Sequence, residues 1–348
     1  MRQGIARHKL RFRHVDLRRA AKIDTLGRVS TTLHPMRLIL ASVAGLLLAC
    51  REAEPPLAKP GPPQQQASTA HEPTPIHIAA YADSAIPTGP LGTSIRRGLA
   101  LVEHTPDSLP AYVGGNLRCT SCHLDRGLRA DAAPLAGTYA RFPKYMDRSD
   151  AVVLIEDRVN YCFTRSLAGR ALPPRSREMV DIVSYLAFVS RGVGVGGHVR
   201  GEGMPKMPAL TGDTVRGHDV FSANCVRCHG ADGAGIAAVP ALWGPRSFSI
   251  GASMARVERA ASFVRNNMPF DTPGSLTAQQ AYDVAAFVDS HARPDSPGKE
   301  LDWPNGGAPA DVPYATKGRT PAVLVPVLPR RLTDGALVPA PVAAGGKS

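Results

Sequence analysis

The sequence lacks a long hydrophobic run, since its N-terminal apolar stretch, Leu38 to Leu48, has only eleven residues. A helix needs about 20 apolar residues to cross a bilayer, so this stretch is too short to span a membrane with ease. The chain also has almost none of the apolar–polar alternation that is typical of strands. Beyond its N-terminal region it has little excess charge, because from Cys50 onward 31 Lys and Arg face 27 Asp and Glu. This net charge of +4 makes no case for nucleic-acid binding.

The N-terminal region carries most of the formal charge of +12 and has the layout of a secretory signal. Residues 1–35 contribute +7, and Met36-Arg37, the apolar run and Leu47-Leu48-Ala49-Cys50 follow. This ending resembles a bacterial lipobox, whose cysteine is lipidated. We predict that residues 1–35 are an upstream extension outside the protein, that 36–50 are a lipoprotein signal peptide, and that lipid on Cys50 holds the protein to the periplasmic side of a membrane. Arg51, where an Asp could follow the lipidated cysteine, favours the outer membrane. The alternative to a lipoprotein signal is an ordinary signal peptide or an uncleaved anchor.

The chain contains the haem-attachment pattern Cys-x-x-Cys-His twice, at Cys119, Cys122 and His123 and again at Cys225, Cys228 and His229. Two thiols one helical turn apart reach the two vinyl groups of one porphyrin edge, and the adjacent histidine then lies under the iron. A single match could be a redox dithiol or half of a zinc site. Two matches behind an export signal predict two covalently bound haem c groups, with His123 and His229 as proximal ligands. A proline follows each histidine by eleven residues, and we expect the carbonyls of Pro134 and Pro240 to orient the imidazoles.

The two motifs belong to an imperfect repeat with a period of about 106 residues. Each half opens with an expected helix, over 93–103 and 213–224, and closes with a stronger one. Ser176 can cap the first closing helix, and Thr277 with Gln280 forms a capping-box pattern for the second. Helices at both ends and irregular loops between them predict an all-α fold of two tandem class I cytochrome c domains. The predicted boundaries are a disordered tether over 51–80, a first domain over 81–195, a Gly/Pro linker over 196–212, a second domain over 213–315 and a disordered tail over 316–348.

The second axial ligand of each iron is predicted from a shared offset. Met268 lies 39 residues after His229, in an Asn-Met-Pro loop that core packing explains poorly. Cys162 lies at the same offset after His123 and is the one cysteine with no other assignment. A thiolate ligand would lower the potential of the first haem, whereas the thioether of Met268 would raise that of the second. A buried free thiol or an intermolecular disulfide remains the alternative for Cys162, and Met204 and Met207 are weaker candidates at the second haem.

Several blocks of sequence resemble the dihaem thiosulfate dehydrogenase family. They are Gly115-Asn-Leu-Arg118, Phe142-Pro-Lys-Tyr-Met-Asp-Arg148, Asp157-Arg-Val-Asn-Tyr-Cys-Phe-Thr-Arg-Ser166, Arg175 to Met179, Asn267-Met-Pro269, Asp302-Trp-Pro304 and Asp311-Val-Pro-Tyr314. Together they span roughly residues 90–315, and the block around Cys162 is the most specific. The resemblance implies oxidation of two thiosulfates to tetrathionate, reversible in some members, with two electrons passing from the first haem to the second and then to a periplasmic cytochrome or another acceptor. It also implies His/Cys ligation by His123 and Cys162, and a basic catalytic pocket of Arg148, Arg158, Arg165 and Ser166.

Two other functions remain open at this stage. A pure dihaem electron carrier would use Cys162 only to tune the first haem and would have no anion pocket beside it. An oxidoreductase for another sulfur oxyanion would share the pocket but not the substrate. Within the family reading, Cys162 acts either by leaving the iron or by forming a sulfur adduct. Some family members carry a switchable lysine ligand at the position of Asn267, so no such switch is expected here.

Overall fold

The computed structural model describes residues 76–330 apart from 79, 237 and 324. The predicted extension, signal peptide and lipidated Cys50, most of the tether and the last 18 residues of the predicted tail lie outside the described residues. No helix in the described part of the chain is long and apolar enough to cross a membrane.

Helices dominate the described chain, and the few strands are two or three residues long. The α-helices are α1 (Gly89–Glu103), α2 (Thr105–Ser108), α3 (Leu124–Gly127), α4 (Ile155–Tyr161), α5 (Arg177–Val189), α6 (Thr214–Asn224), α7 (Val226–His229), α8 (Val257–Asn267) and α9 (Ala278–Asp289). A π-helix over Cys162–Ser166 continues α4. The strands are β1 (Lys144–Met146) paired antiparallel with β2 (Ala151–Val153), and β3 (Arg293–Pro294) paired parallel with β4 (Val327–Leu328). The mostly helical fold with little sheet agrees with the predicted all-α class.

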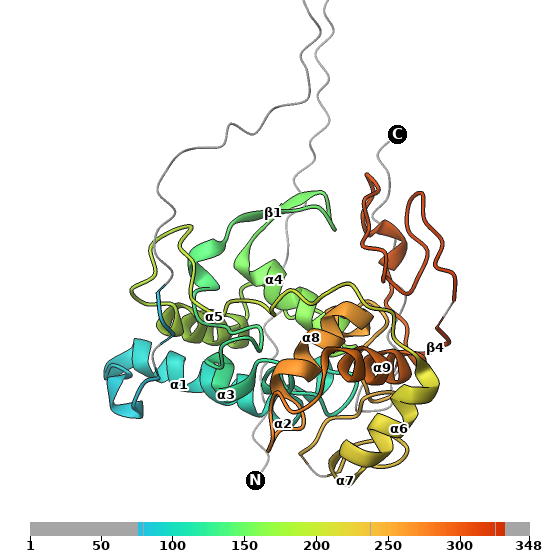
Figure 1. Cartoon of the computed structure of the whole chain (residues 1–348). Helices are drawn as coiled ribbons and strands as arrows, with labels where there is room; N and C mark the ends of the chain where they lie inside the picture. Colours follow the sequence, from blue (N-terminus) through green and yellow to red (C-terminus); the bar gives the residue numbers. More distant parts are fainter. Residues whose placement is uncertain (1–75, 79, 237, 324, 331–348) are drawn as a thin grey trace, which may run out of the picture. The chain divides into compact units, whose positions relative to one another are not determined.

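Each domain is built on a crossing of its first and last helices, α1 with α5 and α6 with α9 (Figure 1). Glycine makes both crossings possible. A Cβ on Gly98 would lie 2.0 Å from the carbonyl oxygen of Asp181, and one on Gly217 would lie 2.0 Å from that of Asp283. Because real Cβ atoms do not approach backbone that closely, any larger residue would push the helices apart. The repeat seen in the sequence is therefore a repeat of this packing geometry.

The predicted helix starts are confirmed at the side chains that cap them. Ser176 accepts a hydrogen bond from the backbone N–H of Met179 at the start of α5. Thr277 and Gln280 form a reciprocal capping box at the start of α9. These bonds satisfy backbone donors that a helix N-terminus leaves unpaired. The first helix differs from the expectation only in starting at Gly89 rather than at residue 93.

Two predictions about irregular regions were wrong in part. The segments between the terminal helices are not loops throughout, because α4, its π-helical continuation and α8 lie there. The predicted tail is ordered from 316 to 330 in the described part: β4 pairs with β3, and the buried Arg330 donates to the carbonyl oxygens of Ala168 and Gly169. An arginine that satisfies buried carbonyls anchors a chain whose composition alone indicates disorder.

The two domains share one apolar core across their boundary. Phe248, Ala252 and Ala255 of the second domain belong to the same buried cluster as Met179 and Leu186 of α5. Met179 is fully buried in this cluster. The predicted linker has no helix in its described residues and lies against the body, since Val199 is buried and pairs with Ile76.

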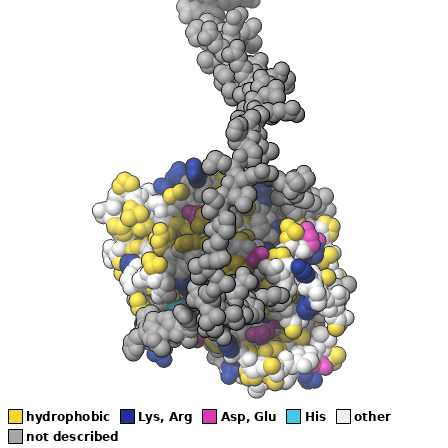
Figure 2. Space-filling view, turned by 90° about the horizontal axis from the view of Figure 1, so that it is seen from above, with side chains coloured by type: hydrophobic (Ala, Val, Ile, Leu, Met, Phe, Trp, Pro, Cys, Tyr) yellow, Lys and Arg dark blue, Asp and Glu magenta, His cyan; other side chains and the backbone are white. Residues whose placement is uncertain are grey.

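On the face seen in Figure 2, Lys and Arg side chains lie at several places among acidic and apolar side chains, with a group of them at the upper edge. Side chains of both signs are therefore present on this face, in keeping with the modest net charge of the sequence from Cys50 onward.

Candidate functional site

Both motif histidines are oriented by backbone carbonyls. His229 Nδ1 lies 3.1 Å from the carbonyl oxygen of Pro240, as predicted. His123 Nδ1 instead lies 2.5 Å from the oxygen of Ala133, so the prediction of Pro134 was wrong by one residue. The shift arises because the loop before Pro134 takes left-handed conformations, with φ of 48° at Ala133. An Nδ1–H that donates to a carbonyl leaves Nε2 unprotonated and available to a metal.

The motif cysteines suit covalent attachment of a porphyrin. All four are free thiols, Cys119 and Cys122 in the first domain and Cys225 and Cys228 in the second. Burial raises the pKa of Cys119 to about 11, of Cys122 to about 12 and of Cys225 to about 11. These thiols therefore stay neutral at physiological pH when nothing is bound to them. The residues present fit one c-type haem in each domain.

Cys162 is the first residue of the π-helix. The N–H of Leu167 donates to the Cys162 carbonyl at 2.8 Å, five residues back, and this bond defines the wider turn. The buried side chain of Asn160 makes two bonds to the backbone of Leu172, at 2.8 and 3.0 Å, and so ties the following loop to α4. π-Helical turns are rare and frequently lie at functional sites. Here the extra residue per turn places Cys162 and Arg165 on a single short element.

The thiol of Cys162 differs from the motif cysteines in its electrostatics. Burial disfavours its thiolate, but the charge of Arg158 and a contact with His123 outweigh burial and lower the pKa of Cys162 to about 6. The Nη1 of Arg158 lies 3.1 Å from the sulfur. At neutral pH this cysteine is a thiolate, the form that binds metals and attacks sulfur.

A cavity of about 340 Å³ lies beside this element. Basic side chains dominate its wall, and they come from both domains: Lys144, Arg148, Arg158, Arg165 and Arg256. Other residues that line it are Tyr145, Met146, Asp147, Tyr161, Ser166, Gly251, Ser253 and Trp303. The volume lies within the range of sites for small molecules. The four predicted pocket residues Arg148, Arg158, Arg165 and Ser166 thus meet in one cavity next to Cys162.

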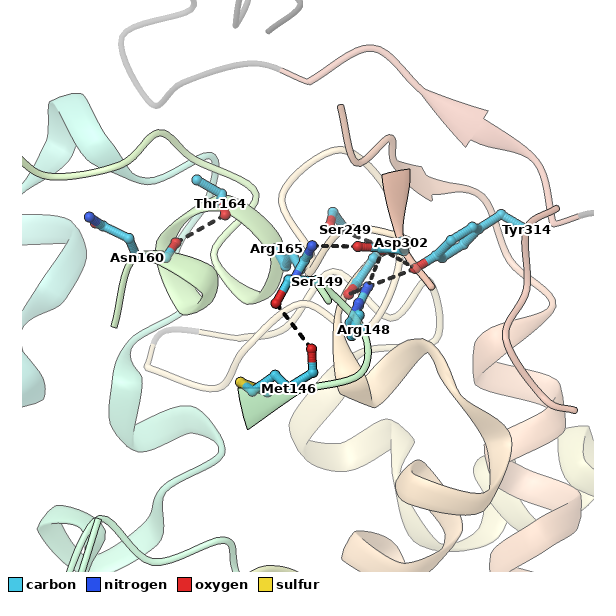
Figure 3. Close-up of polar contacts among 10 residues, drawn as sticks. Met146, Arg148, Ser149, Asn160, Thr164, Arg165, Ser249, Asp302 and Tyr314 are labelled. Atoms are coloured by element: carbon cyan, nitrogen blue, oxygen red, sulfur yellow. Dashed lines mark hydrogen bonds and ion pairs between the residues drawn. The ribbon is translucent and has the colours of Figure 1, made fainter. Parts of the chain in front are cut away.

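The cavity keeps part of its positive charge. One buried carboxylate, Asp302, pairs with both Arg148 and Arg165 (Figure 3). Arg256 pairs with Asp311 at 2.8 Å. Within the described chain, Arg158 and Lys144 make no ion pair with a carboxylate. The arrangement can therefore hold a small anion with more than one negative charge, through the planar donor forks of the arginines.

The ligand loop of the second domain follows α8. Met268 is half-buried and packs against an apolar cluster that includes Phe263 and Met204. Asn267 is 1% exposed and donates to the carbonyl oxygens of Asp131 and Phe263, both at 3.2 Å. The side chain before the methionine is therefore held in packing with the first domain.

Sequence reasoning missed the contribution of the second domain to the cavity. Arg256 was not predicted, and no pattern around it indicates such a role. Lys144 and Trp303 stand in the blocks that carry the family resemblance, but without an assigned role. Asp302 was likewise quoted without a function, although it contacts two of the predicted arginines. The contacts of Asp302 with Arg148 and Arg165 join residues more than 100 positions apart in sequence, which spacing within one domain cannot reveal.

Comparison with known families agrees with a two-domain cytochrome. Residues 114–195 match the family described as SoxA/TsdA, cytochrome c domain. Residues 212–288 match the family described as cytochrome c oxidase, cbb3-type, subunit III. The chain therefore consists of two cytochrome c domains, which bind haem c.

Individual relatives cover most of the described chain. A thiosulfate dehydrogenase of Allochromatium vinosum is 41% identical over 236 residues, which are 65% of this chain and 87% of that protein. A thiosulfate dehydrogenase of Thiomonas intermedia is 35% identical over 270 residues, 76% of this chain and 86% of that protein. Among solved structures, thiosulfate dehydrogenase (TsdBA) from Marichromatium purpuratum in its "as isolated" form matches with a TM-score of 0.61 and 34% identity. That match covers 64% of this chain and half of the solved chain.

Proposed function

The chain belongs to the thiosulfate dehydrogenase family of oxidoreductases, and from this membership we propose that it is a dihaem c-type cytochrome that oxidises two thiosulfate ions to tetrathionate. The observation that carries the proposal is the basic cavity beside Cys162. A pure electron carrier has no use for such a cavity.

The reaction joins two anions and requires an acceptor for two electrons. One sulfur–sulfur bond forms between the terminal sulfurs of two thiosulfates, two electrons leave, and no proton is exchanged. When bound, each haem iron supplies a one-electron acceptor, so the pair matches the two electrons of the new bond. A periplasmic cytochrome or another acceptor then takes the electrons from the second domain. Reduction of tetrathionate is the same chemistry in reverse.

The arginines bring the two substrates together. Each thiosulfate carries two negative charges, so two of them repel one another strongly at bonding distance. Arg148 and Arg165 are mostly buried, and in a site with little water their attraction for anions is much stronger than at the surface. Ser166 adds a hydroxyl that can donate a hydrogen bond. Their effect is to offset the repulsion that slows the reaction in solution.

Arg158 connects the cavity to Cys162, which does not itself line the cavity wall. The guanidinium of Arg158 stabilises the thiolate at 3.1 Å and also lines the cavity. We assign His123 and Cys162 as the axial ligands of the first haem, and His229 and Met268 as those of the second. Cys119 with Cys122, and Cys225 with Cys228, attach the two porphyrins.

The location follows from the N-terminal sequence. We propose that the protein acts in the periplasm and is held to a membrane by lipid on Cys50. Replacing Cys50 with Ser should release holoprotein into the soluble periplasmic fraction. If the variant stays with membranes, a different anchor holds it.

A two-direction assay of the purified holoprotein tests the activity. Thiosulfate with ferricyanide should yield one tetrathionate for every two ferricyanides reduced. Tetrathionate with reduced viologen measures the reverse reaction. Sulfite with ferricyanide is the control arm for another sulfur oxyanion. Turnover with sulfite but not thiosulfate would change the substrate, and no turnover in any arm, with both haems present, would leave only electron transfer.

A further inference from the structure

We propose that Asp302, together with the hydroxyl of Tyr314, is a positioning residue that fixes Arg148 and Arg165 in the orientation that aligns two substrate anions. The inference rests on the proposed thiosulfate chemistry for its catalytic consequence. The positions of the two arginines are set by their hydrogen bonds to Asp302.

The carboxylate of Asp302 bridges the two guanidinium groups. Arg165 Nη2 donates to Oδ1 at 2.6 Å, and Arg148 Nη2 donates to Oδ2 at 2.8 Å (Figure 3). One oxygen serves each arginine, so the carboxylate sets both the distance and the relative angle of the two groups. Charge-assisted bonds of this length are among the stronger hydrogen bonds in proteins.

Tyr314 closes a triangle with Arg148 and Asp302. Its O–H donates to Asp302 Oδ2 at 2.6 Å, and its oxygen accepts from Arg148 Nη2, also at 2.6 Å. Burial raises the pKa of Tyr314 far above its usual range, so the phenol keeps its proton. The same Nη2 also lies 2.8 Å from the carbonyl oxygen of Gly251, so its two hydrogens are shared among three acceptor oxygens. Arg148 therefore has little freedom to turn.

Asp302 also offsets the electrostatic repulsion between the two buried arginines. Each has a side chain only 16% exposed, and two buried cations side by side repel one another. The pKa of Arg165 is lowered by its burial and by the charge of Arg148, while Asp302 acts in the opposite direction. One negative charge shared by two guanidinium groups leaves the pair with a net charge of +1. Such a pair is stable enough to be buried and still attracts an anion.

Asp302 acts from behind the arginines rather than on the substrate. Its side chain is 2% exposed and does not line the cavity, whereas both arginines do. The neighbouring Trp303 lines the cavity with φ of 53°, a conformation that costs energy for a bulky residue. Its N–H donates to the carbonyl oxygen of Arg148 at 2.8 Å, and its ring lies 4.9 Å from that guanidinium. The strained segment thus holds Arg148 at both backbone and side chain.

Arg148 keeps an unused donor. Its Nε is buried and has no hydrogen-bond partner within residues 76–330. A buried donor without a partner is costly, so this arginine depends on the hydrogen bonds at Nη2 to hold it in place. The geometry therefore fixes Nη2 to the protein, while the same side chain lines the cavity.

The test compares Asp302→Asn with a matched control in steady-state kinetics. Asn keeps the shape but removes the charge, so the cavity becomes more cationic while its arginines lose their anchor. We expect kcat to fall about 100-fold, as a displacement near 1 Å can cause, with KM within about threefold of wild type. The kcat of Asp302→Glu should be at least tenfold higher than that of Asp302→Asn, because the charge is kept. Tyr314→Phe should lower kcat about tenfold relative to wild type, which corresponds to the loss of one hydrogen bond. Asp283→Asn is the control, because Asp283 is equally buried and pairs with Arg216 at 2.8 Å, and neither residue lines the cavity.

A second readout does not depend on turnover. Phenylglyoxal modifies arginines, and peptide mass spectrometry gives the rate at Arg148 and at Arg165. Both rates should rise at least tenfold in Asp302→Asn and stay unchanged in Asp283→Asn. Unchanged labelling, a normal kcat, or a raised KM with unchanged kcat would overturn the proposal. If wild-type holoprotein does not turn over thiosulfate, the proposed function fails, and the labelling rates alone then decide the role of Asp302.

Discussion

The two domains carry the same helical frame but differ in the segment between the haem motif and the closing helix. Both cross two helices at a glycine, Gly98 or Gly217, and both place a buried aspartate of the closing helix against an arginine that precedes this glycine. In the first domain the intervening segment contains a π-helix with Cys162 and a basic cavity. In the second it contains α8 and then Met268.

This difference shows where function resides in such a repeat. Under the proposed ligand assignment, the frame sets the position of a residue 39 places after each proximal histidine, and the residue found there sets the chemistry. The basic cavity lies beside the cysteine; the second domain contributes Arg256 and Trp303 to its wall, and Asp302 contacts two of its arginines. Under the proposed function, the first domain binds substrate, while the second both receives electrons and completes the site of the first.

The largest effect is expected at the residue that distinguishes the domains. Cys162→Gly should retain both haems, because neither the motif cysteines nor the proximal histidines are touched. Thiosulfate oxidation should fall by several orders of magnitude, as losing a group central to the chemistry does. Steady-state turnover with ferricyanide measures it, at matched haem content. Near-normal turnover would exclude a catalytic role for the thiolate.

The next effect concerns the cation that supports the thiolate. Arg158→Gln removes both the charge 3.1 Å from the sulfur of Cys162 and one cation of the cavity wall. We expect kcat/KM to fall by roughly 10²- to 10³-fold, the usual loss for one preorganised charge donor. Arg170→Gln is a matched control, because Arg170 is exposed and does not line the cavity. Equal losses in the two variants would mean that the effect is not local.

A smaller effect on turnover is expected at Met268. Met268→Gly should lower the potential of the second haem, since axial ligands move haem potentials over a range of about 0.8 V and a thioether favours the reduced form. Loss of the sulfur-to-iron absorption band near the red end of the oxidised spectrum should accompany the change. Redox titration checks the potential, and the first haem should be unaffected. An unchanged spectrum would reassign the ligand, with Met204 and Met207 as the next candidates.

The smallest effects are expected where the domains are alike. Burial disfavours the carboxylates of Asp181 and Asp283, but hydrogen bonds from Arg97 and Arg216 outweigh it and lower both pKa values. A depressed folded pKa adds stability above the unfolded value of about 4, and this stability is lost as pH falls through the folded pKa. Asp181→Asn and Asp283→Asn should each lower the free energy of unfolding by about 1–3 kcal/mol at pH 7. The loss should lie toward the lower end of this range because the arginines are partly exposed. At pH 2 either substitution should have little effect on the free energy of unfolding.

Thermal unfolding at the two pH values measures this difference. Each variant should melt below wild type at pH 7 and near it at pH 2. A variant as stable as wild type at pH 7 would show that the crossing does not depend on its ion pair.

Much of the frame could be predicted from sequence because its signals are local. Helix caps such as Ser176 and Thr277 act within four residues, and the haem motif is contiguous. Cys162 could be singled out because it lies at the same offset from His123 as Met268 does from His229. The π-helix was not predicted, since the hydrogen bond that defines it shows no distinct residue pattern.

The rest of the site could not be predicted because it depends on contacts between distant segments. Asp302 reaches Arg148 across 154 residues, and Arg330 reaches Ala168 across 162. The Pro- and Ala-rich composition near the C-terminus predicted disorder, yet β4 pairs with β3 and the buried Arg330 bonds to distant backbone in the described part of that segment. The acceptor of His123 was misplaced by one residue because left-handed backbone at Ala133 has no signature in a non-glycine sequence.

Electron paramagnetic resonance of the oxidised holoprotein tests the central claim, that the two domains differ in the sulfur ligand at one shared position. The account predicts two low-spin signals, one typical of a thiolate-ligated haem and one of a methionine-ligated haem. Cys162→Gly should remove only the first, and Met268→Gly only the second. A thiolate signal that survives in Cys162→Gly, or that is absent from the wild type, would contradict the account.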